Sequence, residues 1–267
     1  MFTALVGVGL TYVVTPQQLS LWGWRIPLLI GCLIIPLIYW LRQSLRETEA
    51  FKRKTHHPTG SETLKILLAN WRLVIIGMML SIMTTTTFYL ITAYTPTYGR
   101  TALHLDIRDN LIVTLCVGLS NFIWLPIGGA ISDRIGRRPL LLLIPAMAIC
   151  TAYPAMLWLV DAPSFGKLLT VLLYFSIFFG MYNGAMIPFL AEFMPPQVRT
   201  AGFSLAFSLA TAVFGGFTPA VSTWLIDVTG NRASPALWLS TAAALSLSAV
   251  LMSRGLAKNA WREDTIE

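Results

Sequence analysis

The chain has 267 residues, of which 55% are hydrophobic and 12% are charged, and its formal net charge is +7. This composition excludes an ordinary soluble domain, in which about a quarter of the residues are charged, and is typical of a protein that crosses the membrane several times. Cytoplasmic loops that retain lysine and arginine, and contact with anionic lipid, explain the positive charge without a nucleic-acid partner.

The chain begins with two apolar runs. Met1–Val14 is too short to span a bilayer, and it lacks the basic start and the small-residue cleavage pattern of a signal peptide. We therefore interpret it as the end of a truncated helix. Ile26–Leu41 is long enough to span if Trp24 and its neighbours are included. Residues 1–42 are thus expected to be the end of one helix and the whole of the next, preceded by further chain.

A basic, polar segment over residues 43–72 follows, and we interpret it as a cytoplasmic linker. It contains a predicted amphipathic helix over Glu62–Leu68 on the membrane face. His56 and His57 are adjacent and have no third ligand nearby, so they predict no metal site. Seven basic residues lie in or beside this segment: Arg42, Arg46, Lys52, Arg53, Lys54, Lys65 and Arg72.

Six longer apolar runs without internal basic residues predict an all-α bundle over residues 73–253, followed by a cytoplasmic tail over 254–267. A helix needs about 20 apolar residues to cross the hydrocarbon core. The runs are Leu73–Tyr98, Asn110–Ser132, Pro139–Val160, Leu168–Ala191, Thr200–Ile226 and Pro235–Ser253. Each cysteine lies alone in an apolar run and is expected to be a small buried hydrophobic residue without a disulfide or a metal: Cys32, Cys116 and Cys150.

The positions of lysine and arginine predict the orientation of these helices. With the linker in the cytoplasm, 14 of the 19 basic residues fall on the cytoplasmic side. The opposite side receives the remaining five: Arg25, Arg100, Arg108, Lys167 and Arg232.

A short charged stretch, GGAISDRIGRRP, separates two of the runs. We expect Gly128 and Gly129 to end a helix where a second helix approaches closely, and Asp133 to meet the positive end of a neighbouring helix. A plain basic loop would need neither the acid nor the glycines. The remaining residues are expected to form a tight cytoplasmic turn and to start the next helix: Arg134, Gly136, Arg137, Arg138 and Pro139.

The pattern Gly129-x-x-x-Asp133-Arg134-x-Gly136-Arg137-Arg138 resembles the cytoplasmic loop motif of the major facilitator superfamily, which that family carries after its second helix and again after its eighth. The resemblance implies that the six runs are helices seven to twelve, and that residues 1–42 are the tail of helix five and all of helix six. In the family, the acid and the arginines hold one state of the transport cycle. The expected fold is therefore an all-α polytopic membrane protein containing the C-terminal six-helix bundle.

A second charged stretch, Ala191–Thr200, resembles the acid-and-arginine turn that joins helices ten and eleven in the same superfamily. We hypothesise that one charge network closes the cytoplasmic gate in the outward-facing state. Its four members are Asp133, Arg137, Glu192 and Arg199.

Longer segments resemble one particular group of transporters within this superfamily. Arg199–Pro219 is similar to the metabolite:proton symporters, and Met83–Tyr89, Ser120–Pro126 and Met181–Met186 look most like their citrate-proton group. The resemblance implies proton-coupled citrate transport across a bacterial inner membrane by alternating access. Tricarballylate, 2-oxoglutarate, shikimate, proline and betaine remain alternatives.

A tricarboxylate in a membrane needs compensating positive charge, yet the complete runs contain no interior lysine, arginine or histidine. We expect the cationic ligands and the proton-coupling carboxylate to lie in an upstream N-terminal half. The expected partners are a small anion, protons, lipid and that N-terminal half.

This part of the chain is expected to supply hydrogen bonds. Thr84–Thr87 form a hydroxyl-rich stretch, although at least half of these threonines are expected to bond their own helix backbone. The polar residues either line a substrate cavity or join helices to one another. The cavity candidates are Tyr94, Asn121, Asn183, Tyr89, Thr87 and Tyr182.

Gly215, Gly216 and Pro219 are expected to bend one helix during alternating access, or else to serve static packing. An embedded enzyme and a channel are less favoured. His104, Asp106 and Asp109 have no recognised catalytic spacing, and no filter motif is present. The sequence predicts no catalytic residue, metal or cofactor.

Overall fold

The computed structural model describes residues 6, 9–10, 15–44, 60–195 and 198–263, and every regular element in them is a helix. The chain divides into two compact units, Met1–Glu62 and Thr63–Glu267. Seven helices in the described part are long and apolar enough to cross a membrane. The predicted run Met1–Val14 and the His56–His57 pair fall largely or wholly outside the described residues.

The described residues of the first unit contain one membrane-length helix. A short α2 (Pro16–Gln18) and a π-helical turn, η1 (Leu19–Gly23), lead into α3 (Arg25–Ser44). The guanidinium of Arg25 donates to the carbonyl of Leu21 and lies 4.7 Å from the ring centroid of Trp24. Aromatic and basic side chains combine in this way where a helix enters the polar edge of a bilayer.

The second unit confirms the six predicted runs as helices. The predicted amphipathic helix is α5 (Gly60–Ala69). The spans that follow are α6 (Trp71–Phe88) with the π-helical η2 (Tyr89–Ala93), α8 (Ile107–Ile135), α9 (Arg137–Asp161), α10 (Phe165–Phe193), α11 (Arg199–Ala210) continued by η3 (Thr211–Gly215) and α12 (Thr218–Thr229), and α13 (Pro235–Glu263).

Two of these spans are irregular. α6 passes through η2 before α7 (Thr95–Thr101), and α11 passes through η3 before α12. The predicted bend near Gly215, Gly216 and Pro219 therefore coincides with a real interruption, and α12 begins one residue before Pro219. The two π-helical turns lie against each other, since a Cβ on Gly215 would meet the Tyr89 ring at 3.0 Å.

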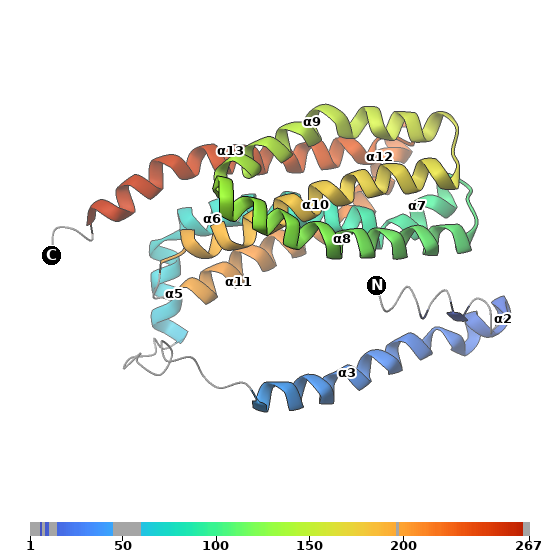
Figure 1. Ribbon diagram of the computed structural model, residues 1–267, viewed down its shortest axis with the longest axis horizontal. Coiled ribbons are helices and arrows are strands. Elements are labelled where there is room, and N and C mark those ends of the chain that lie inside the picture. The colour runs from blue at the N-terminus through green and yellow to red at the C-terminus, as the bar shows by residue number, and fades with distance from the viewer. Residues whose placement is uncertain (1–5, 7–8, 11–14, 45–59, 196–197, 264–267) are drawn as a thin grey trace. The chain divides into compact units, whose positions relative to one another are not determined.

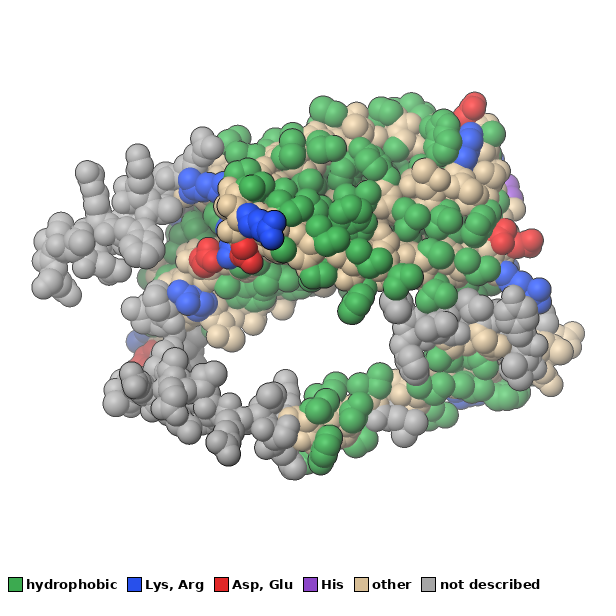
Figure 2. Space-filling view, in the orientation of Figure 1, with side chains coloured by type: hydrophobic (Ala, Val, Ile, Leu, Met, Phe, Trp, Pro, Cys, Tyr) green, Lys and Arg blue, Asp and Glu red, His purple; other side chains and the backbone are tan. Residues whose placement is uncertain are grey.

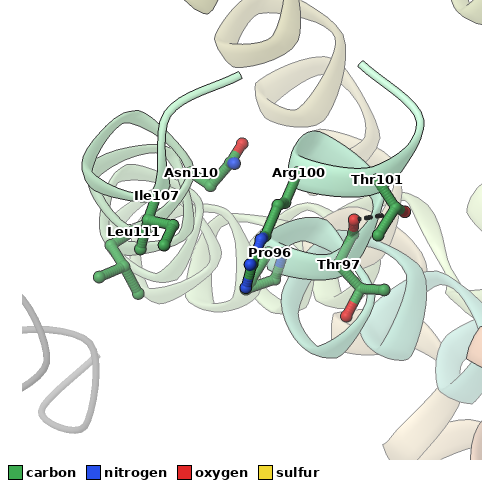
Figure 3. A pocket seen from close by; sticks show the side chains of 7 residues that line it. All are labelled: Pro96, Thr97, Arg100, Thr101, Ile107, Asn110 and Leu111. Atoms are coloured by element: carbon green, nitrogen blue, oxygen red, sulfur yellow. Dashed lines mark hydrogen bonds between the residues drawn. The ribbon is translucent and has the colours of Figure 1, made fainter. Parts of the chain in front are cut away.

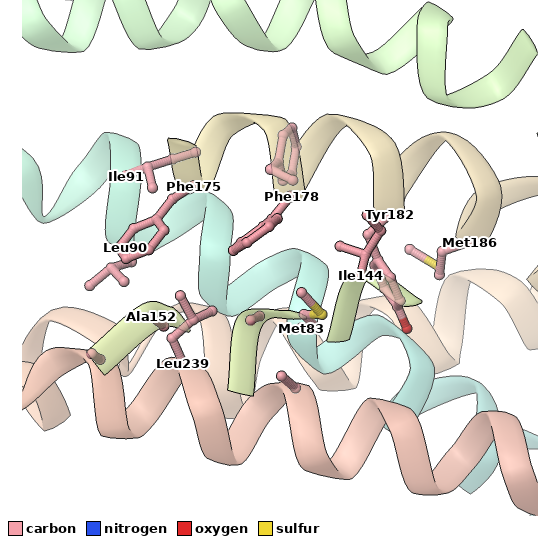
Figure 4. Close-up of a cluster of buried hydrophobic side chains, with 14 of the residues drawn as sticks. Met83, Leu90, Ile91, Ile144, Ala152, Phe175, Phe178, Tyr182, Met186 and Leu239 are labelled. Atoms are coloured by element: carbon pink, nitrogen blue, oxygen red, sulfur yellow. The ribbon is translucent and has the colours of Figure 1, made fainter. Parts of the chain in front are cut away.

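Helix α10 supplies much of the core of the second unit. It lies along α8 and also contacts α6 and α9, while α9 lies along α13 (Figure 1). Figure 4 shows large α10 side chains meeting residues of α6, α9 and α13 in one buried cluster. The labelled members include Phe175, Phe178, Tyr182, Met186, Met83, Ile144 and Leu239.

The contact between α8 and α10 depends on glycine. A Cβ on Gly184 would lie 2.4 Å from the Gly129 nitrogen, and one on Gly128 would lie 2.7 Å from the Gly180 oxygen. The predicted close approach is therefore confirmed. The prediction that Gly128 and Gly129 end a helix is wrong, because α8 continues to Ile135 and the glycines serve packing within it.

The cysteines were expected to be buried, and this prediction is wrong for two of them. Cys32 on α3 and Cys150 on α9 are exposed, while Cys116 on α8 is intermediate; all three are free thiols. An apolar thiol on the outer face of a membrane-length helix is suited to lipid, so hydropathy alone did not distinguish it from a core residue.

Charged side chains gather at the two ends of the second unit, and a broad hydrophobic surface separates them on the face shown in Figure 2. We call the end that contains the α8–α9 and α10–α11 junctions the Arg137 end. The opposite end, formed by the α7–α8, α9–α10 and α12–α13 junctions, is the Tyr98 end. This division is expected of helices that cross a bilayer.

Candidate functional site

The turn at the Arg137 end depends on one glycine. Gly136 has φ 90° and ψ 157°, a backbone conformation that side chains with a Cβ rarely adopt. It separates α8 from α9 within a single residue. Helix α9 begins at Arg137, so Pro139 lies inside its first turn instead of starting the helix as predicted.

Arg137 is the centre of an ion cluster that joins three helices. Its guanidinium donates to the carboxylate of Asp133 and to Ser132 Oγ at 2.8 Å, both on α8. Its second terminal nitrogen lies 3.3 Å from Glu192 Oε1 on α10. The Arg137 side chain is 23% exposed and the acids more than half exposed, so each pair contributes on the order of 0–1 kcal/mol.

Three members of the predicted four-residue network therefore meet, and the fourth does not. Arg199 is the exposed first residue of α11 and has no ion pair in the described part of the chain. Asp133 was expected to meet the end of a neighbouring helix, and its partner is instead the Arg137 side chain. Arg134 is exposed and Arg138 half-buried, and neither joins the cluster.

Asn121, predicted as a cavity residue, joins two helices. Its Oδ1 lies 2.6 Å from Ser176 Oγ on α10, which is also 2.8 Å from Ser120 Oγ. Asn121 is 8% exposed. This small polar group fastens α8 to α10 in the middle of the membrane-length region, as the alternative interpretation predicted.

Other cavity candidates also use their polar groups within the bundle. The fully buried Tyr182 hydroxyl donates to the Leu80 carbonyl at 2.9 Å. The Thr87 hydroxyl donates to the carbonyl of Met83 in its own helix at 2.6 Å. Tyr89 is half-buried against Gly215. The Tyr182 bond joins α10 to α6, and the bond of Thr87 within its own helix leaves it no free hydroxyl.

The threonine stretch divides as predicted. Thr85 bonds carbonyls of its own helix, as Thr87 does, whereas the hydroxyls of Thr84 and Thr86 have no partner in the described residues. The carbonyl oxygen of Asn183 on α10 is also buried without a partner in that part of the structure. Asn183 is thus a predicted cavity residue whose side-chain oxygen has no partner among the described residues.

The Tyr98 end contains a polar cluster that the sequence did not predict. The Tyr98 hydroxyl donates to the Arg232 carbonyl at 2.8 Å, and Asn231 Nδ2 donates to the Tyr153 hydroxyl at 3.0 Å. The Tyr94 ring lies 5.6 Å from the Tyr98 ring at an interplanar angle of 36°, and the Thr223 hydroxyl donates to the Tyr94 hydroxyl at 3.3 Å. The bonds of Tyr98 and Asn231 tie the α12–α13 turn to the other helices.

Burial raises the pKa of the Tyr98 phenol, and the neighbouring Tyr94 adds to this effect. Burial likewise raises the pKa of Tyr94. Both phenols therefore stay protonated at physiological pH and act as hydrogen-bonding groups.

A pocket of about 430 Å³ lies beside this cluster between α7 and α8 (Figure 3). Arg100 lies at the pocket and has no ion-pair partner among the described residues. The pocket would admit a small molecule, but its lining is mostly apolar. It is formed by Pro96, Thr97, Arg100, Thr101, Ile107, Asn110 and Leu111.

Comparisons of the chain with known proteins agree on one family. Residues 1–219 match the Major Facilitator Superfamily. The chain is 58% identical to the citrate-proton symporter of Salmonella typhi and 55% identical to that of Klebsiella pneumoniae, over 93% of its length. It is 27% identical over 85% of its length to the proline/betaine transporter of Escherichia coli (strain K12).

The chain spans 57%, 56% and 47% of these three relatives, respectively, and thus about half of their length. No solved structure matches it.

Proposed function

Because the chain belongs to the major facilitator superfamily, we propose that it is the C-terminal portion of a secondary active transporter that carries citrate together with protons. The observation that carries this proposal is the high identity to two citrate-proton symporters over nearly the whole chain. The seven membrane-length helices of the described residues, and the gathering of charge at the two ends of the second unit on the face shown in Figure 2, support it. The more distant proline/betaine relative supports the transporter class but not its substrate.

We further propose that the Arg137 end faces the cytoplasm of a bacterium and that the protein lies in the inner membrane. The excess of lysine and arginine in the linker and at the α8–α9 turn supports this orientation. The Tyr98 end, with its pocket beside Arg100, would then face the outside, where an anionic substrate arrives.

The ion cluster is proposed to keep the cytoplasmic ends of α8, α9 and α10 together while the substrate site is open to the outside. Its acids are more than half exposed, so a moving partner would reach them without unpacking the bundle. Asp133→Asn and Glu192→Gln remove one carboxylate charge each. Asp161→Asn, an exposed acid at the other end of α9, is the matched control.

We expect the two cluster variants to change both the rate of transport and the labelling of a cysteine introduced at the cytoplasmic end, and we expect Asp161→Asn to change neither. If Asp133→Asn and Glu192→Gln left the rate and the labelling at wild-type values, the cluster would have no role in gating.

The transport proposal itself is tested with labelled citrate. The chain is reconstituted in proteoliposomes with its upstream half restored, with and without an inward proton gradient. Gradient-driven accumulation that excess unlabelled citrate blocks is the expected result. An absence of uptake by folded protein would exclude citrate, and tricarballylate, 2-oxoglutarate, shikimate, proline and betaine would be tested next.

A further inference from the structure

Helices α6 and α10 run antiparallel with a register that three contacts define. A Cβ on Gly77 would lie 2.8 Å from Leu190 Cδ1, Ser81 Oγ lies 3.8 Å from Met186 Sδ, and the Phe88 and Phe179 rings lie 5.5 Å apart. Moving a given number of residues forward along α6 therefore corresponds to moving the same number of residues backward along α10. The same register places Thr84 level with Asn183, between the second contact and the third.

Both residues at that level carry unused polar atoms. Thr84 Oγ1 and Asn183 Oδ1 are buried without a hydrogen-bond partner in the described part of the chain, and the residues are 3% and 6% exposed. Thr85 and Thr87 show the usual alternative, a bond to a carbonyl of their own helix. A buried polar group without a partner costs about 1–3 kcal/mol, so two such groups at one level call for a third group between them.

The pair lies close to an exposed part of the α6–α10 seam. Phe88, one turn beyond Thr84 on α6, is 43% exposed, and Ile187, one turn beyond Asn183 on α10, is 39% exposed. An exposed apolar side chain therefore lies one helical turn from each of the two polar residues. A ligand at this surface would reach them after a small movement of the side chains around them.

We propose that Thr84 and Asn183 form a recognition site for a hydroxyl group, and that in the transporter this is the hydroxyl of the substrate. A hydroxyl group both donates and accepts, so it can donate to Asn183 Oδ1 and accept from Thr84 Oγ1. An ionised carboxylate accepts only and would leave Asn183 Oδ1 without a donor. This inference rests on the proposed function, and it assigns the site to the one hydroxyl that distinguishes citrate from tricarballylate.

Two substrates that differ only in this hydroxyl give a direct test. The transporter with its upstream half restored is assayed for citrate and tricarballylate uptake, first as wild type and then as Thr84→Val, which keeps the shape and removes the hydroxyl. Asn183→Leu is the second variant. Thr85→Val is the matched control, because the Thr85 hydroxyl already bonds carbonyls of its own helix and lies 3.5 Å from the Ala210 carbonyl oxygen on α11.

We expect Thr84→Val and Asn183→Leu to raise the half-saturating concentration of citrate about 10-fold, equivalent to about 1.4 kcal/mol, and to leave that of tricarballylate unchanged. Thr85→Val should change neither. Equal effects on both substrates would mean that the pair only packs the helices, and an unchanged citrate value would mean that it does not contact the substrate. Either result overturns the inference.

Thermal unfolding separates a substrate site from a site that holds a permanent structural water. Removing the unpartnered Thr84 hydroxyl should leave the Tm of the substrate-free protein unchanged or raise it. A Tm lowered by Thr84→Val would show that a fixed water uses this hydroxyl, and would overturn the proposal. If the wild-type protein does not transport citrate, the proposed function is wrong, and this result is distinct from a failure of the Thr84–Asn183 proposal. The variants are then compared on an anion that the protein does transport and on the analogue of that anion without its hydroxyl group.

Discussion

The glycine contact between α8 and α10 allows a prediction that compares alanine substitutions at two glycines of this contact, Gly184 and Gly129. In Gly184→Ala the new Cβ would lie 2.4 Å from the Gly129 nitrogen and 2.7 Å from the Leu125 oxygen, both backbone atoms that no rotamer change can move. Relief requires the helices to separate by about 1 Å, because ordinary contacts lie near 3.5–4 Å. Overpacking of this kind costs roughly 1–3 kcal/mol.

Gly129→Ala is the matched control, since its Cβ would meet nothing nearer than the Gly184 oxygen at 3.9 Å. Alanine is favoured over glycine within a helix by about 0.5–1 kcal/mol, so this variant should be as stable as wild type or slightly more stable. The assay is the temperature at which the chain, purified in detergent, loses its monodisperse peak after heating. Equal midpoints for the two variants would refute the close approach of these helices.

Two further predictions concern other contacts. Gly215→Ala would place a Cβ 3.0 Å from the Tyr89 ring and 3.1 Å from Thr85 Cβ, so we expect the maximal uptake rate to fall several-fold with little change in half-saturating concentration; Gly166→Ala, which meets nothing within 4 Å, is the control. Tyr98→Phe removes the bond to the Arg232 carbonyl and should cost about 1 kcal/mol in thermal unfolding. Because burial raises the pKa of Tyr98, its phenol should ionise only above the ordinary tyrosine value of about 10. In an alkaline titration followed by absorbance, the part of the wild-type signal that is missing from Tyr98→Phe should therefore appear only above that pH.

Hydropathy predicted the spans of the second unit because each of its six apolar runs is long enough to allow one interpretation only. The Asp133–Arg137–Glu192 cluster was also predictable, since charges are rare in this chain and topology brings the α8–α9 and α10–α11 turns to one end. Arg199 was assigned wrongly because the direction of a side chain at a helix start depends on the local turn. Proximity along the chain does not determine that direction.

The partners of the mid-membrane polar residues could not be predicted from sequence. Asn121 meets Ser176 only because the glycines bring α8 and α10 together in one particular register. The π-helical turn at Tyr89–Ala93 likewise has no local signal in its own sequence, YLITA. Both depend on the packing of segments distant in sequence, which composition and periodicity do not report.

These contacts distinguish a rigid part of the second unit from a part that is able to deform. α8 and α10 are joined directly at two levels, by the glycine contact and by Asn121 with Ser176, and Arg137 at the start of α9 bridges Asp133 on α8 to Glu192 on α10, so a movement of one helix must carry the other. The irregular backbone lies elsewhere, in η2 and η3, where regular helical hydrogen bonding is already interrupted and where Gly215 contacts Tyr89. We therefore expect conformational change to concentrate at η2 and η3 while α8 and α10 move as one body. The Gly215→Ala variant tests this division, because a wild-type uptake rate there would mean that the π-helical turns are not the point of movement.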